Sequence, residues 1–178
     1  MSDLTHQVLA ELDASHVDAI ASRLGVDPAQ ADAAIRQAVP VLVGGLANTA
    51  STDDGADVVH AAAADHAGFD IGSLLGGLLR GGAGGSILGR TLGDAQGPAT
   101  QGLGRSSGLG TQNAGQLLAI LAPIVLSVLG KLSRNQNLDP GALGGVLGQE
   151  SQRLAQGGGL LGELLKFGTG LLNPRGTA

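Results

Sequence analysis

The stretch TQNAGQLLAILAPIVLSVLGKLSR, residues 111–134, decides the fold of this chain. Its leucine, isoleucine and valine residues recur at helical spacing, and most of the helix circumference is apolar. A helix of this kind is stable only when other elements surround it. We therefore predict a central core helix in which Leu121 and Val125 are buried.

A membrane span is the alternative interpretation of the same stretch. The uncharged apolar run covers residues 117–130, and fourteen helical residues rise about 21 Å, less than a hydrocarbon core of about 30 Å. Lys131 follows the run directly. The N-terminal sequence MSDLTHQVLAELD also lacks the basic region and apolar run of a signal peptide. We therefore favour a buried helix and a cytoplasmic location, and membrane contact remains the less favoured alternative.

The rest of the chain has further helical patterns with recognisable ends. We expect Ser15 to cap one helix that ends at Gly25, and Asp27 to cap the next, with Gln30 closing a capping box. Asp139, followed by proline, should cap the last of these helices. The patterns cover residues 3–12, 15–25, 26–51, 53–68 and 137–157.

The chain contains a weak internal repeat. Residues 17–47 resemble the segment 83 positions later, so that Gly25 corresponds to Gly108 and Pro40 to Pro123. Proline inside a helix is disfavoured by about 3 kcal/mol, so its shared position is informative. We predict an all-α, compact multi-helix bundle built from two weakly similar helix–turn–kinked-helix units, joined by a glycine-rich connection.

That connection spans residues 68–110, in which fifteen of 43 residues are glycine. Within GLLRGGAGGSILGRTLGDAQG, residues 77–97, every fourth residue is glycine. A continuous helix here is disfavoured, because each interior glycine costs about 1 kcal/mol relative to alanine. We predict two short helices separated by a flexible turn at 81–85. Close packing in a soluble core and simple flexibility both remain open as reasons for the glycines.

The domain organisation follows from these patterns. We expect an N-terminal helical unit at 1–67, the connection at 68–110, and a C-terminal helical unit at 111–172 that shares the same core, followed by a tail at 173–178. Residues 1–70 hold eleven acidic and two basic residues, whereas residues 71–178 hold four acidic and eight basic residues. The two parts could pair their charges within one fold, or the charges could be solvated separately.

Apolar residues in the connection form a candidate interaction surface. They would expose a large apolar patch if they were not covered, and such patches usually mark interaction sites. Docking on the same bundle and self-association with a second copy are both open. The surface comprises Leu74, Leu75, Leu78, Leu79, Ile87 and Leu88.

Three blocks of sequence resemble the bacterial YidB-like family, a domain of unknown function. The blocks are DPAQADAAIRQAVPVLVGGLA, GGSILGRTLG and GQLLAILAPIVLSVLGK, in this order. The likeness covers roughly residues 15–155. It implies a small, all-helical bacterial protein without an established activity, so no catalytic or binding residue is carried over. The glycine content of 68–110 and the GLLGELLKFG segment depart from the family pattern.

Several chemistries are poorly supported. Cysteine is absent, which excludes disulfides and thiolate metal sites. The glycines match neither phosphate-loop pattern, the four histidines include no pair at i, i+4, and no G-x-S-x-G elbow occurs. Basic residues are scattered without interleaved aromatics, which disfavours nucleic-acid binding. We therefore expect no catalytic, cofactor or metal site.

Two classes of function remain compatible with the sequence, and an enzyme of unknown type is the third possibility. The first is a non-enzymatic interaction or scaffold protein whose partner is another protein or a second copy of itself. The second is a peripheral membrane-associated helical protein.

Overall fold

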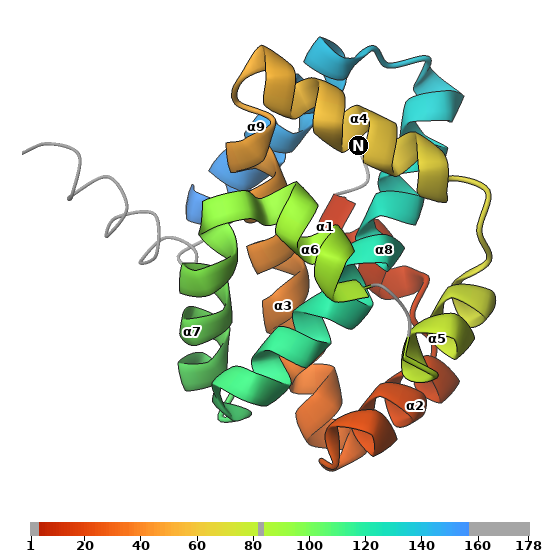
Figure 1. Ribbon diagram of the computed structural model, residues 1–178, viewed down its shortest axis with the longest axis vertical. Helices are drawn as coiled ribbons and strands as arrows, with labels where there is room; N and C mark the ends of the chain where they lie inside the picture. Colours follow the sequence, from red (N-terminus) through yellow and green to blue (C-terminus); the bar gives the residue numbers. More distant parts are fainter. Residues whose placement is uncertain (1–3, 82–83, 157–178) are drawn as a thin grey trace, which may run out of the picture.

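A computed structural model describes residues 4–81 and 84–156 of the chain, and these residues form helices without any strand (Figure 1). The prediction of an all-α bundle is confirmed. In chain order the helices are α1 (Leu4–Ala10), α2 (Ala14–Leu24), α3 (Pro28–Thr49), α4 (Asp53–His66), α5 (Ile71–Leu79), α6 (Gly84–Leu92), the 3₁₀ helix η1 (Gly93–Ala95), α7 (Gln96–Ser106), α8 (Gly110–Gln136) and α9 (Pro140–Gln156).

The central helix is α8, which runs diagonally through the bundle in Figure 1 and contacts α3, α4, α6 and α7. Leu121 and Val125 are both fully buried, so the core prediction is confirmed. Ser127 is also buried, and its hydroxyl donates a hydrogen bond to the carbonyl oxygen of Phe69 at 3.3 Å. The core therefore consists of aliphatic side chains from almost every described helix, arranged around α8.

The two repeat units have the same order of elements. In the first, α2 ends at Gly25 in the left-handed conformation, and α3 follows with Pro40 inside it. In the second, α7 is followed by a turn at Gly108, where φ is 70°, and by α8 with Pro123 inside it. Each unit is thus a short helix, a glycine turn and a long proline-containing helix, as the sequence predicts.

One predicted helix start is wrong. The N-cap of α2 is Asp13, two residues before the predicted Ser15, because Asp13 and His16 form a reciprocal capping box. The His16 amide donates to Asp13 Oδ1 at 3.0 Å, and the Asp13 amide donates to His16 Nδ1 at 3.3 Å. Ser15 lies inside the helix and donates its hydroxyl to Asp13 Oδ1 at 2.6 Å.

The other predicted caps differ in outcome. Asp27 does precede α3, but its side chain makes no capping hydrogen bond, so the predicted capping box with Gln30 does not form. Asp139 behaves as predicted, because its Oδ1 accepts a hydrogen bond of 2.7 Å from the Ala142 amide at the start of α9.

Within the described residues, glycines bring five pairs of helices into close contact. At each site a Cβ atom in place of the glycine hydrogen would overlap the backbone of the neighbouring helix or segment. Such contacts allow closer helix approach than any other residue permits. The five contacts are Gly55 with Thr49 (α4 with the end of α3), Gly84 with Ala119 (α6 with α8), Gly104 with Gly110 (α7 with α8), Gly130 with Ala63 (α4 with α8) and Gly144 with Ala50 (α9 with the end of α3).

The six evenly spaced glycines of 77–97 are not this packing seam. Five of them have open space at the Cβ position, and Gly89 approaches only the flexible side chain of Gln96. Gly81 and Gly93 instead adopt positive φ angles of 104° and 51°, which interrupt the helical path. The two predicted short helices are present as α5 and α6. Part of the turn predicted at 81–85 lies outside the described residues.

Candidate functional site

A groove with a volume of about 400 Å³ lies between α4 and α6. Val58 of α4 lines it and is 40% exposed, which is unusual for a large aliphatic side chain in this bundle. Ile87, from the facing wall on α6, is partly buried. We call this feature the α4–α6 groove; it is lined by Val58, Ala61, Ala62, Asp65, His66, Ser86, Ile87, Arg90 and Thr91.

Both walls of the groove are attached to α8 by glycine contacts. Gly130 of α8 lets α4 approach at Ala63, and Gly84 of α6 lets that helix approach α8 at Ala119. Because α4 and α6 both pack against α8, the distance between the two walls depends on how closely each of them approaches α8. The small side chains of Ala61 and Ala62 leave space between the walls that larger residues would fill.

Hydrogen bonds fix the end of the α6 wall. The Thr91 hydroxyl donates to the Ile87 carbonyl at 2.8 Å, within α6. The Thr49 hydroxyl at the end of α3 donates to the Thr91 carbonyl at 2.7 Å. Thr91 is almost fully buried, so these bonds also satisfy polar groups removed from water. The side of the groove formed by α6 is therefore held in place by both α3 and α8.

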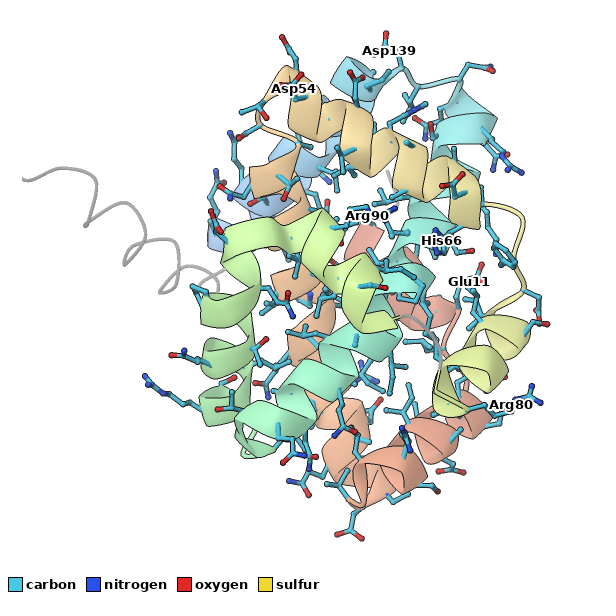
Figure 2. All side chains as sticks on the ribbon, viewed as in Figure 1. Glu11, Asp54, His66, Arg80, Arg90 and Asp139 are labelled. Carbon is cyan, nitrogen blue, oxygen red and sulfur yellow. The ribbon has the colours of Figure 1, made fainter. Side chains whose placement is uncertain are left out.

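Polar groups of both signs border the groove. Asp65 and His66 belong to α4, and Arg90 belongs to α6; Figure 2 shows Arg90 and His66 beside the space between the two helices. In residues 4–81 and 84–156, neither Asp65 nor Arg90 has an ion-pair partner within 4.0 Å. Their charges are therefore available to a molecule that enters the groove.

His66 is held in a defined orientation at one end of the groove. Its Nδ1 lies 2.7 Å from the Ala62 carbonyl oxygen. Because a carbonyl only accepts, Nδ1 carries the proton and Nε2 is the acceptor in the neutral ring. The ring also contacts Phe69, with ring centroids 6.0 Å apart, and Phe69 is 51% exposed. An aromatic surface thus extends from the end of the groove.

The predicted interaction surface is distributed differently in the fold. Its leucines at 75 and 88 are buried in the core. Those at 74, 78 and 79 and Ile87 are partly buried, and Ile87 alone among the six lines the α4–α6 groove. The bundle itself therefore covers part of the predicted surface. Binding of a partner by the remaining side chains stays a prediction.

Sequence reasoning missed the α4 wall of the groove. Val58 stands next to Val59, and adjacent residues on a helix point about 100° apart, so a narrow apolar stripe faces the core with only one of them. The adjacent valines were therefore the sequence signal that one of the two is exposed. In the structure Val59 is fully buried and Val58 is exposed. The alanines gave no signal, because alanine is common on both buried and exposed helix faces.

Other chemistry is sparse in the described part of the chain. Within residues 4–81 and 84–156 there is no group of three or more His, Cys, Asp or Glu side chains that could hold a metal. In the same described residues, one ion pair links the acidic first part of the chain to the basic second part. It joins Lys131 Nζ to Glu11 Oε2 at 3.5 Å, and both side chains are partly exposed. Most charges are therefore solvated separately.

One described helix, α8 (Gly110–Gln136), is long and apolar enough to cross a membrane. Its most apolar 18-residue window is 72% buried inside the bundle. This is the pattern of a core helix in a water-soluble fold, although the length and composition alone would fit a membrane span.

A family described as "Bacterial protein of unknown function (DUF937)" matches residues 6–132, well over half of the chain. YidB belongs to this family, so the resemblance noted in the sequence is confirmed. No curated protein and no solved structure matches the chain.

Proposed function

We propose that this chain, which belongs to the DUF937 family of bacterial proteins of unknown function, is a non-enzymatic interaction protein whose α4–α6 groove receives an apolar helix. The observation that carries this proposal is the 40% exposure of Val58 in a groove of about 400 Å³. Water contact with a large aliphatic side chain is unfavourable, and burial of that side chain by a partner would favour binding.

The lining defines the kind of helix that fits. Ala61 and Ala62 allow close approach of a backbone, and Val58 and Ile87 offer apolar contacts from the two walls. Helices that bind in grooves use apolar anchors at i, i+3 or i+4, and i+7. The partner should therefore present a continuous apolar stripe over about two turns.

The charges determine the orientation of that helix. Asp65 lies on the α4 wall and Arg90 on the α6 wall. A partner helix that carries a base on one flank and an acid on the other pairs with both, and the reversed helix meets like charges. The partner is another protein or a second copy of this chain, and the proposed location is the cytoplasm.

Peripheral membrane association is the alternative function, and the apolar length of α8 favours it. Membrane insertion of α8 would require the surrounding helices to leave it, because most of its apolar window is buried. That step would expose the core of the bundle to water or lipid. The interaction proposal needs no such rearrangement, and we prefer it for this reason.

The proposal is tested by comparing what the full chain and two arginine variants capture from bacterial extracts. Ala61→Arg places a long charged side chain in the groove, at an exposed position. Ala64→Arg is the matched control, because Ala64 is exposed on the same helix but does not line the groove. Circular dichroism should show that both variants are folded.

The supporting result is a protein, identified by mass spectrometry and then purified, that binds the natural chain and the Ala64→Arg variant but not the Ala61→Arg variant. Light scattering across concentration applies the same comparison to self-association. Equal binding by all three chains would overturn the proposal that the groove is the binding surface.

A further inference from the structure

We infer that the helix received by the α4–α6 groove is α4 of a second copy of this chain. A two-fold axis that runs along the groove relates the two copies, so that each α4 lies in the groove of the other copy. The inference rests on the proposed function, because it names the occupant of the proposed binding groove. A two-fold contact must be self-complementary, which means that α4 and the groove have to match each other in shape and charge.

The exposed apolar side chains of the bundle lie on α4 and just beyond its end. In residues 4–81 and 84–156, the large apolar side chains that are exposed are Val58 and Phe69, at 40% and 51%. Val58 lines the groove, and the Phe69 ring contacts the ring of His66, which lines the groove too. Both therefore belong to the same region of the surface, and contact with a second copy there removes apolar area from water.

The groove side of α4 suits close packing against another helix. Its lining residues recur at i, i+3, i+4 and i+7, which is one face of a helix: Val58, Ala61, Ala62 and Asp65. The two alanines stand in the middle of this face, and their short side chains let the backbones of the two α4 helices approach each other. Rotation about an axis parallel to the helices leaves positions along them unchanged. Val58 of each copy therefore faces Val58 of the other.

The charges of the two walls select the direction of the two-fold axis. An axis along the groove gives each α4 contact with α6 of the other copy, whereas an axis across the groove gives contacts mainly between identical helices. α6 carries Arg90 and no acid, and α4 carries no lysine or arginine. The first arrangement therefore joins opposite charges and the second joins like charges. The acids of α4 are Asp53, Asp54, Asp57 and Asp65.

Two symmetry-related ion pairs follow, in which Asp65 of each copy pairs with Arg90 of the other. Both residues border the same groove, yet neither has an ion-pair partner within 4.0 Å in the part of the chain that the structure describes. The contact surface is limited to α4, α6 and the neighbouring Phe69. Interfaces of small area are usually transient, so we expect a reversible dimer whose population rises with protein concentration.

Charge exchange in the purified full chain, followed by analytical ultracentrifugation across concentration, tests this inference. Asp65→Arg alone and Arg90→Asp alone should each weaken the dimer at least about tenfold, because each variant places like charges at both contacts. An equimolar mixture of the two variants should dimerise with an affinity within about threefold of that of the natural chain. In the mixed dimer one copy has arginine at both positions and the other has aspartate at both, so both ion pairs are restored.

The control pair is Asp18→Arg with Arg105→Asp, which makes the same charge changes at exposed positions on α2 and α7 that do not line the groove. Alone or mixed, these variants should dimerise like the natural chain. Disulfide formation tests the direction of the axis, because the natural chain has no cysteine. Val58→Cys should give a disulfide-linked dimer at least about tenfold faster than Ala64→Cys, which is exposed on α4 outside the groove.

A chain that stays monomeric from about 1 μM to about 1 mM would overturn the inference. A dimer that the Asp65 and Arg90 variants do not weaken, a loss that mixing does not restore, or equal disulfide rates at positions 58 and 64 would overturn it as well. The capture experiment with Ala61→Arg and Ala64→Arg is scored separately. A different protein that binds the groove of a monomeric chain would support the proposed function and overturn this inference alone.

Discussion

Replacement of Gly130 by alanine tests whether backbone contact between α4 and α8 holds the bundle together. A Cβ atom at this position would overlap the Ala63 carbonyl oxygen and the Ala67 Cβ, both on the α4 side. Neither atom can move by rotation about a side-chain bond. The two helices must therefore separate, and the α4 wall of the groove must move with them.

The expected magnitude follows from two opposing terms. Alanine gains about 1 kcal/mol over glycine inside a helix. Overpacking of a close-packed core typically costs about 1–3 kcal/mol, and a rigid backbone partner places this site at the upper end or beyond. We therefore expect the free energy of unfolding to fall by about 2 kcal/mol. For a chain of this size, that corresponds to a Tm about 4–8 °C lower.

The matched control is Gly145→Ala. Gly145 is exposed inside α9, and nothing lies within 4 Å of its Cβ position. The same substitution should therefore stabilise the protein, by about 0.5–1 kcal/mol. Thermal and urea unfolding followed by circular dichroism measure both variants. A Gly130→Ala protein that is as stable as the natural chain, or more so, would refute the close-packing account.

The remaining predictions concern the core, a helix cap and location. Leu121→Ala should lower the free energy of unfolding by about 2–5 kcal/mol, because the leucine is fully buried; an unchanged urea midpoint would refute this. Hydrogen bonds from the Ser15 hydroxyl and the His16 amide lower the pKa of Asp13 below its ordinary value of 3.8. The Asp13 contribution to stability should therefore be present above about pH 3.8 and lost as pH falls through the lower folded pKa. Asp13→Ala should reduce Tm at pH 6 and have little effect at pH 2, and an effect of equal size at both pH values would contradict this assignment. After cell lysis without detergent the protein should remain in the supernatant, and recovery only in carbonate-washed membranes would favour the membrane alternative.

The sequence predicts the elements of this fold better than their contacts. The apolar pattern of 111–134 predicts the central helix, because a helix with few polar positions has no stable place on the surface. The paired prolines and glycine turns predict the two units, since both residue types restrict the backbone locally. These signals depend on neighbours along the chain, so they are visible without a structure.

Contacts between distant segments are not visible in the same way. Gly130 is close-packed because Ala63 lies opposite it, whereas Gly77 and Gly97 have open space despite their regular spacing. The periodicity of the glycines therefore did not indicate which of them pack. The cap of α2 was misplaced for a local reason: a serine beside an apolar stripe is a strong N-cap signal, and the reciprocal bonds of Asp13 and His16 outcompete it.

The candidate site was the least predictable part. The α4–α6 groove exists because two helices from different parts of the chain pack on α8, and the apolar part of its α4 wall is formed by two alanines and one valine. None of these residues is distinctive alone. Ile87 was identified because it belongs to an apolar burst, but the same reasoning selected Leu75 and Leu88, which the core buries.

Photo-cross-linking from position 58 in the full chain, inside bacterial cells, tests the central claim most directly. A photoreactive amino acid replaces Val58 in one variant and Gln112 in the other, and mass spectrometry identifies the cross-linked peptides. If the α4–α6 groove receives an apolar helix, position 58 should give cross-links to an apolar helix of one defined partner or of a second copy, and position 112 should not. Cross-linking from position 58 that is no more frequent or specific than from position 112 would show that the groove is an ordinary solvated surface, and would contradict the account.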